Sequence, residues 1–152
     1  MKIKRLFFLG LLLSCFTFFL TAQSNTVIDE LLEKQNADFG RSSYMVLTAS
    51  GLIDDNSTME ESIKYLTKHG WDMGDKEPGA YITLGEYSFI LMQYFEMDSG
   101  IMYKIFPGPR YAARELYYLK LIDEDGSPGR TISGEEVIRI LGRLMEWKES
   151  TL

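Results

Sequence analysis

Cysteine and histidine are nearly absent from this 152-residue sequence, and their scarcity limits the chemistry that it can perform. The one cysteine, Cys15, lies in an apolar N-terminal segment that we expect to be removed. Its removal would leave no thiol for disulfides, metal ligation or nucleophilic attack. The one histidine, His69, stands at the end of a predicted helix, where the helix dipole favours a partly positive side chain. We therefore interpret His69 as a structural residue rather than a catalytic one.

Positive charge is also in short supply. The chain has 16 basic and 22 acidic residues, which gives a net charge of −6, and removal of residues 1–22, with three basic and no acidic residues, would leave −9. Such a surface argues against binding nucleic acid or anionic lipid through overall charge. No glycine-rich loop ends in the Lys-Ser/Thr pair that holds nucleotide phosphates. These absences predict a protein that is not an enzyme and that needs no cofactor or metal.

Residues 1–22 have the plan of a secretory signal peptide. A basic start is followed by a mainly apolar run from 6 to 20 and then by small and polar residues. The run is shorter than the roughly 20 residues of a membrane span. We expect cleavage after Ala22 and export to the periplasm or cell envelope of a bacterium. The stretch LLSC, which ends at Cys15, resembles a lipobox, so a lipoprotein attached to the membrane through Cys15 is the alternative.

An internal repeat with a period of 50 residues organises the rest of the chain. Residues 61–98 align without a gap on residues 111–148. Identical pairs fall at the turn, at the helix entry and on one helix face: Leu66/Leu116, Asp75/Asp125, Pro78/Pro128, Gly79/Gly129, Ile82/Ile132, Glu86/Glu136, Ile90/Ile140, Leu91/Leu141 and Glu96/Glu146. A repeat of this length is typical of stacked units that share one core.

Each repeat is predicted to be a helix, a loop and a second helix. The first helix is expected at 59–69 and at 110–120, and the second at 84–97 and at 134–147. A Ser/Thr-x-x-Glu pattern before each second helix predicts a capping box, in which the hydroxyl accepts a backbone N–H and the glutamate reaches back. The predicted caps are Thr83 with Glu86 and Ser133 with Glu136. Helix 84–97 is apolar on more than one side, so we expect it to be the central one.

A degenerate third unit precedes these two. Residues 49–66 resemble 121–141 with part of the loop removed, and a helix is expected before them at about 39–50. The sequence thus predicts an all-α fold, with two clear and one degenerate helix-loop-helix repeats packed into one small helical domain at 43–150. Residues 23–42 are expected to form a weakly ordered lead or a short helix. The connector 96–110 is expected to be non-helical and to pack on the bundle.

The loops of both repeats partly match a calcium-binding EF-hand loop. In a 12-residue frame that begins at Asp125, Glu136 holds the last ligand position, and Asp75 and Glu86 hold the same two positions in the other repeat. Both frames have glycine at position 5, where a side-chain oxygen is needed. A calcium-binding module is therefore kept as an alternative, and capped helices joined by a Pro-Gly turn are the favoured interpretation.

Two stretches, KYLTKHGWDMGDKEPGAYITLGEYSFILMQYF and RELYYLKLIDEDGSPGRTISGEEVIRIL, resemble the S-layer homology repeat. The resemblance covers roughly residues 43–147, and it implies three repeats that form a helical prism and bind cell-wall polysaccharide. In that family the motif Ile-Thr-Arg-x-Glu carries an arginine that meets the anionic polymer. Leu84 and Gly134 stand at that position here. Binding of cell-wall polysaccharide is thus a second alternative.

A group of aromatic residues with one arginine supplies the candidate binding surface. Its members are Tyr103, Phe106, Arg110, Tyr111, Tyr117 and Tyr118. Such residues suit contacts with a protein or a carbohydrate, although packing between the repeats would also explain them. We therefore predict a non-catalytic, exported cell-envelope protein that binds an envelope protein or a cell-wall component, and no nucleic acid, through its helical repeat domain.

Overall fold

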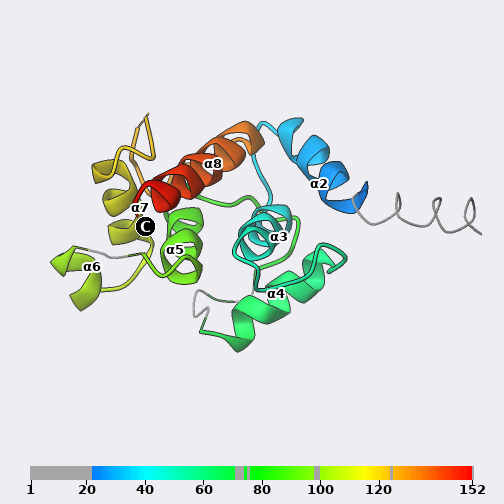
Figure 1. Cartoon of the computed structure of the whole chain (residues 1–152), viewed down its shortest axis with the longest axis horizontal. Coiled ribbons are helices and arrows are strands. Elements are labelled where there is room, and N and C mark those ends of the chain that lie inside the picture. Colours follow the sequence, from blue (N-terminus) through cyan, green and yellow to red (C-terminus); the bar gives the residue numbers. More distant parts are fainter. Residues whose placement is uncertain (1–21, 71–73, 75, 98–99, 124, 152) are drawn as a thin grey trace, which may run out of the picture.

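The computed structural model describes residues 22–70, 74, 76–97, 100–123 and 125–151, so Cys15 and nearly all of the predicted signal peptide lie outside the described residues. The described ranges contain helices, two isolated β-bridges and no strands, which confirms the all-α prediction. In chain order the helices are α2 (Ala22–Leu32), α3 (Phe39–Ala49), α4 (Met59–Lys68), α5 (Leu84–Tyr94), α6 (Ile101–Ile105), α7 (Pro109–Tyr118) and α8 (Gly134–Thr151) (Figure 1). Across those ranges, no helix combines the length and the apolar character needed to cross a membrane.

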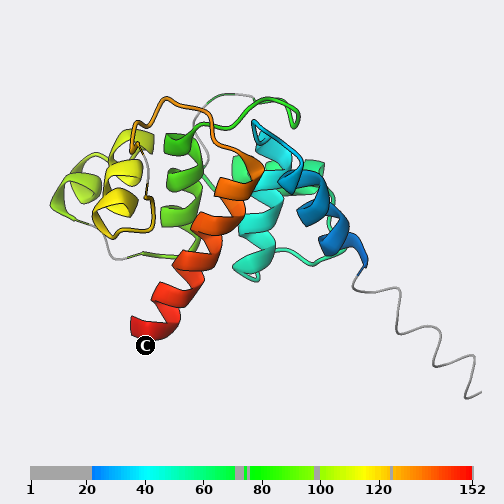
Figure 2. The same ribbon diagram turned by 90° about the horizontal axis from the view of Figure 1, so that it is seen from above.

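Three inner helices, α3, α5 and α8, are each covered by an outer helix. The helix α4 packs on α3, α7 packs on α5, and α2 packs on α8 (Figures 1 and 2). The short α6 packs on α7 at the end of the molecule opposite α2. Each of the pairs α3/α4 and α5/α7 therefore joins helices from different predicted units, so the closest packing does not follow the units 61–98 and 111–148. The repeat itself stays an interpretation.

The apolar faces of these helices form one core. The helix α5 is buried on several sides, with Leu84, Ile90 and Leu91 fully enclosed, which confirms its predicted central place. The fully buried Tyr87 of α5 donates its hydroxyl hydrogen to the Val137 carbonyl of α8 at 2.8 Å. A buried hydroxyl without such an acceptor would be costly, so this bond fixes the register between the two helices.

Hydrogen bonds at their N-termini fix where several helices begin. Capping boxes start α4 and α5, formed by Thr58 with Glu61 and by Thr83 with Glu86. The helix α3 begins after Asp38, whose carboxylate accepts the Arg41 backbone N–H at 2.8 Å. Each such cap is worth about 1 kcal/mol. These local signals explain why the helix starts agree closely with the sequence pattern.

Three loops hold the inner helices together at these N-terminal ends. The start of α3 donates two backbone hydrogen bonds to the loop before α5, at the Ala80 and Pro78 carbonyls (2.7 and 2.8 Å). The start of α5 donates the same pair to the loop before α8, at Arg130 and Pro128 (2.9 and 2.8 Å). The Gly134 N–H at the start of α8 returns to the Lys34 carbonyl before α3 (3.0 Å). The three loops thus form a closed ring.

Two predicted helix ends are wrong. The helix α5 ends at Tyr94 rather than near 97, because Glu96 adopts a positive φ of 50° that the helix cannot continue through. The helix α8 runs to Thr151 rather than ending near 147, since no proline or glycine follows Gly142 to break it.

The prediction of a non-helical connector at 96–110 is also wrong. The helix α6 occupies part of it, between the extended Gly100 and the prolines at 107 and 109. The helix breakers therefore bound this segment without entering it. The expectation that its apolar residues pack on the bundle holds for the half-buried Met97 and Tyr103. It fails for four large apolar side chains, which are exposed: Ile101, Met102, Ile105 and Phe106.

The domain begins earlier than the predicted boundary at residue 43. Leu31, Ala37 and Phe39 are fully buried and belong to the same core as α5 and α8. The expected lead at 23–42 consequently contains α2, a core-forming loop and the start of α3. Local pattern gives a weak signal here because the partner of α2 is the last helix of the chain.

Candidate binding surface

The α6–α7 pair carries the candidate binding residues and is placed by the inward face of α7. Ala112, Ala113 and Leu116 are buried on that face, where α7 packs on α5. Pro109, in the first turn of α7, lies close to Gly85 of α5. A Cβ added to Gly85 would be 3.0 Å from the Pro109 Cβ, so the two helices approach closely there. This contact leaves α6, on the far side of α7 from α2, at one end of the domain (Figures 1 and 2).

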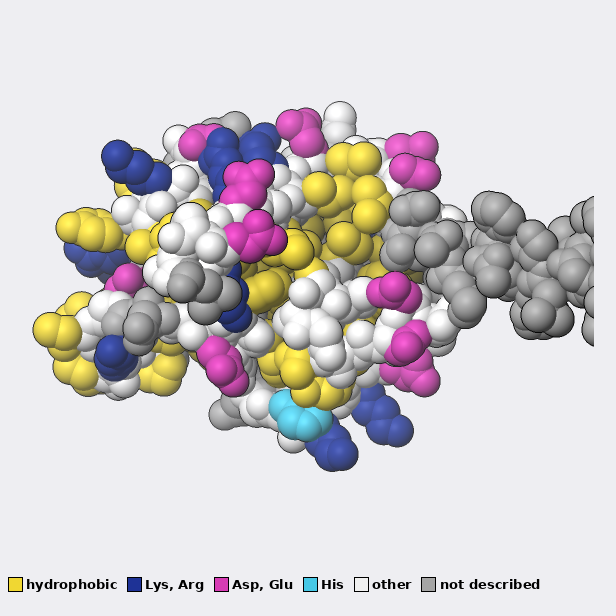
Figure 3. Space-filling model, viewed as in Figure 1, with side chains coloured by type: hydrophobic (Ala, Val, Ile, Leu, Met, Phe, Trp, Pro, Cys, Tyr) yellow, Lys and Arg dark blue, Asp and Glu magenta, His cyan; other side chains and the backbone are white. Residues whose placement is uncertain are grey.

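The helix α6 exposes a large apolar face that sequence reasoning missed. Ile101 is 75% exposed, Ile105 and Phe106 are each 58% exposed, and Met102 is also exposed. The spacings 101/105 and 102/106 place these side chains on one side of a helical turn. Figure 3 shows hydrophobic side chains gathered over this end of the molecule. The six residues between Gly100 and the Pro-Gly-Pro turn at 107–109 give a signal that predicts such a short amphipathic helix.

The six predicted site residues do not form a single cluster. Tyr103 points to the core and packs on Phe89, with ring centroids 6.3 Å apart, and burial raises its pKa to about 12. Phe106 stacks on Tyr111 (6.3 Å) beside the exposed Arg110 at the start of α7. The remaining two lie at the other end of α7, where Tyr117 rests against Gly126 and Tyr118 is 84% exposed. The exposed members therefore lie at the two ends of α7, and the face of α6 is added to them.

Basic side chains accompany this apolar face. Residues 101–120 contain four basic residues, all exposed, and one acidic residue, whereas the whole chain has more acidic than basic residues. The basic residues are Lys104, Arg110, Arg114 and Lys120. We call this exposed set, together with Ile101, Met102, Ile105, Phe106 and Tyr118, the α6–α7 surface. Its chemistry is apolar and cationic.

The predicted cap glutamates are engaged in ion pairs at the helix starts. Both carboxylate oxygens of Glu86 lie 2.6 Å from Lys76 Nζ, and one also accepts the Thr83 backbone N–H at 2.8 Å. Burial would raise the pKa of Glu86, but the hydrogen bonds from Lys76 and Thr83 outweigh it and hold the pKa below its ordinary value. Glu86 therefore acts as a charged cap and loop anchor.

Glu136 makes only half of its predicted capping box. Its backbone N–H donates to Ser133 Oγ at 3.2 Å, as expected, but its carboxylate turns to Arg130, at 2.9 and 2.5 Å. In the same loop the Asp125 carboxylate accepts the Ser127 backbone N–H at 3.0 Å. The ends of the calcium frame are thus occupied by protein donors. Among the described residues no three His, Cys, Asp or Glu side chains gather as a metal site.

The positions of the polymer-binding arginine in the S-layer homology motif are buried in this structure. Leu84 is fully buried. A Cβ added to Gly134 would lie 1.6 Å from the Leu31 carbonyl oxygen, so no larger side chain fits without moving backbone. The starts of α5 and α8 consequently have no room to present a cation there.

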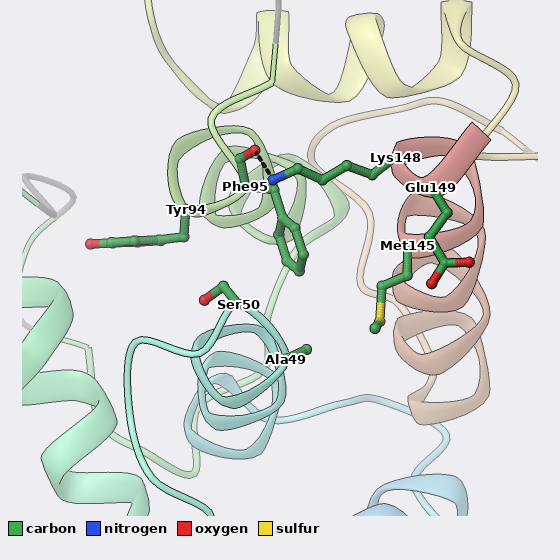
Figure 4. Close-up of a pocket in the computed structure, with 7 residues that line it drawn as sticks. All are labelled: Ala49, Ser50, Tyr94, Phe95, Met145, Lys148 and Glu149. Atoms are coloured by element: carbon green, nitrogen blue, oxygen red, sulfur yellow. Dashed lines mark hydrogen bonds between the residues drawn. The ribbon is translucent and has the colours of Figure 1, made fainter. Parts of the chain in front are cut away.

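Hollows in the described part of the chain lie outside these features, and two of them bear on the site. One, of about 250 Å³, lies between the C-terminal ends of α3, α5 and α8 (Figure 4). Lys148 reaches across it, with Nζ 3.0 Å from the Phe95 carbonyl and 5.5 Å from the Phe95 ring centroid, so its charge caps the end of α5. A shallower hollow of about 630 Å³ is lined by Tyr117, Tyr118, Lys120, Ile122 and Asp123 and adjoins the α6–α7 surface.

His69 keeps its predicted place at the C-terminal end of α4. Its Nδ1 lies 2.8 Å from the Tyr65 carbonyl, and its ring stacks on Tyr65 with centroids 4.0 Å apart.

Comparison of the chain with models of protein families, with curated proteins and with solved structures finds no match. Functional inference therefore depends on the chemistry of the surface.

Proposed function

We propose that this protein is a non-catalytic, exported component of the bacterial cell envelope that docks on another envelope component through its α6–α7 surface. The observation that carries the proposal is the exposure of neighbouring large apolar side chains on α6, led by Ile101, Ile105 and Phe106. Soluble monomers rarely expose large contiguous apolar patches, and those that they expose often serve binding. The basic start and apolar run of residues 1–22 support export.

The energetics favour a docking role for this face. Burial of one large apolar side chain is worth about 1.5–3 kcal/mol. Because Ile101, Ile105 and Phe106 stay exposed in the fold, burial of all three against a partner would contribute several kcal/mol of binding free energy. The flanking Lys104 and Arg110 would direct the face towards an anionic partner, because complementary charge speeds encounter and fixes orientation.

Two further features support a non-catalytic role. Two largely buried carboxylates at helix starts, Glu86 and Glu136, are neutralised by Lys76 and Arg130. His69 is held at a helix end by Tyr65. These groups stabilise loops and helix ends. A catalytic acid or base would instead need access to a substrate.

Fractionation of cells tests the proposal. The double variant Ile105→Ser/Phe106→Ser should fold normally, because both side chains are exposed, and should move from the envelope fraction to the soluble fraction. Leu52→Ser is the matched control, since Leu52 is an exposed apolar residue in the α3–α4 loop. The proposal fails if the double variant and the control fractionate alike.

A further inference from the structure

We infer that the component that the α6–α7 surface contacts is the anionic lipid surface of a membrane, with α6 lying shallowly in the headgroup layer. This inference rests on the proposed docking function and names its partner. It is drawn from the shape of the surface, from the order of its apolar and basic residues, and from the distribution of charge over the chain.

The shape of the surface suits a bilayer. The helix α6 projects at the end of the molecule, and in Figures 1 and 2 it lies away from the inner helices. Its apolar residues Ile101, Met102, Ile105 and Phe106 form a convex tip on one side of a single turn. A convex apolar tip enters a fluid interface without a preformed pocket, whereas a protein partner would need a matching cavity.

The basic residues are placed where lipid phosphates would lie. Lys104 stands between Met102 and Ile105, and Arg110 follows Phe106 after the Pro-Gly-Pro turn. Long basic side chains place their methylene stems in the apolar layer and extend their charge to the headgroups. Apolar residues interleaved with lysine and arginine are typical of segments that bind at membrane interfaces.

The distribution of charge would orient the molecule. The processed chain carries −9 and residues 101–120 carry +3, so the remainder carries −12. An anionic leaflet would attract the α6–α7 end and repel the remainder. The attraction corresponds to about a fivefold gain in binding for each basic side chain near the lipid. Overall charge alone predicts no binding to anionic lipid, and the segregation of charge reverses that expectation at this end.

Charge also argues against a second copy as the occupant. In a two-fold symmetric dimer the same patch faces itself. Lys104 and Arg110 of one copy would then face their equivalents, and like charges would oppose association. A lipid leaflet with excess negative charge has no such conflict.

Vesicle sedimentation tests the inference on the processed protein. Vesicles of phosphatidylcholine with about 30% phosphatidylglycerol, at about 0.15 M salt, should bind the protein, and pure phosphatidylcholine vesicles should bind it far less. Lys104→Glu/Arg110→Glu should weaken binding at least about 25-fold. Ile105→Ser/Phe106→Ser should weaken it roughly tenfold or more. Lys64→Glu/Lys68→Glu on α4, where both side chains are exposed, is the charge-matched control. It should change binding less than about twofold, because salt screens charges that lie far from the lipid.

A single labelled cysteine locates the contact directly. Because the processed chain lacks cysteine, Ile105→Cys can be labelled with an environment-sensitive dye, and Met145→Cys on α8 is the matched control. On addition of anionic vesicles the emission of the dye at 105 should shift to the blue and that at 145 should not. Equal shifts, or no shift at either position, would overturn the inference.

The outcomes separate this inference from the proposed function. If anionic vesicles do not bind the protein, yet Ile105→Ser/Phe106→Ser still leaves the envelope fraction in cells, the docking function stands and its partner is a protein or wall component. If vesicles do not bind and fractionation does not change, both are refuted. Circular dichroism of each variant ensures that loss of binding is read only from folded protein.

Discussion

Two Gly→Ala substitutions in the same helix should change stability in opposite directions. Gly134 begins α8, and a Cβ there would lie 1.6 Å from the Leu31 carbonyl oxygen and 2.4 Å from the Leu31 carbonyl carbon. Both are backbone atoms, so no rotamer change relieves the clash. Gly142, two turns later, is exposed, and a Cβ there meets nothing within 4 Å. The pair therefore separates packing from helix propensity.

The magnitude follows from what must move. To admit a methyl group at 134, α2 must shift away from α8, which partly exposes the fully buried Leu31 and weakens the Gly134–Lys34 backbone hydrogen bond. Partial loss of one buried leucine and of one hydrogen bond predicts a cost of about 2–4 kcal/mol for Gly134→Ala. Gly142→Ala should instead gain up to about 1 kcal/mol from helix propensity.

Urea unfolding followed by circular dichroism measures both changes. For a chain of this size each kcal/mol corresponds to about 4 °C in Tm, so a thermal melt should separate the two variants clearly. If Gly134→Ala is as stable as wild type, α2 does not pack on the start of α8 as described. If Gly142→Ala is also strongly destabilised, the effect belongs to glycine replacement in general rather than to the clash.

Four other outcomes are expected. Glu86→Gln should flatten the loss of stability in acid. Because the folded pKa of Glu86 is depressed, the stability that its carboxylate contributes is present above its ordinary pKa of 4.5 and is lost as pH falls through the folded value. The melting temperature should be equal in chelator and in millimolar calcium; a large rise with calcium would revive the calcium-binding alternative. The processed protein should not cosediment with purified cell wall; salt-sensitive cosedimentation that Arg110→Ala or Arg130→Ala abolishes would contradict this. N-terminal sequencing of the exported protein should begin at or near Gln23, whereas a lipid-modified Cys15 would contradict cleavage after Ala22.

Local chemistry explains which parts of the fold could be predicted from sequence. The Thr83–Glu86 capping box depends on residues three apart, so the start of α5 is legible in the chain itself. The turn of Glu136 towards Arg130 was not predicted, because a capping pattern does not show which cation lies beside the glutamate. The helix starts follow from short-range rules, and the partners of side chains do not.

Long-range packing explains what was missed. The ordered place of α2 depends on α8, which follows it in the chain by about a hundred residues, and no local pattern carries that information. The aromatic residues of the candidate site were recognisable by type, but which of them face water depends on how α7 sits on α5. Tyr103 packs inwards on Phe89, and the aliphatic side chains of α6 are exposed instead.

The hydrogen bond between Gly134 and Lys34 has a consequence for the order in which the domain folds. It joins the first loop of the ring to the last, so the ring cannot close until α8 has been synthesised. Until then Leu31 and the rest of α2 lack the helix on which they pack. Leu31, near the start of the described residues, therefore becomes buried only once the last helix of the chain is in place.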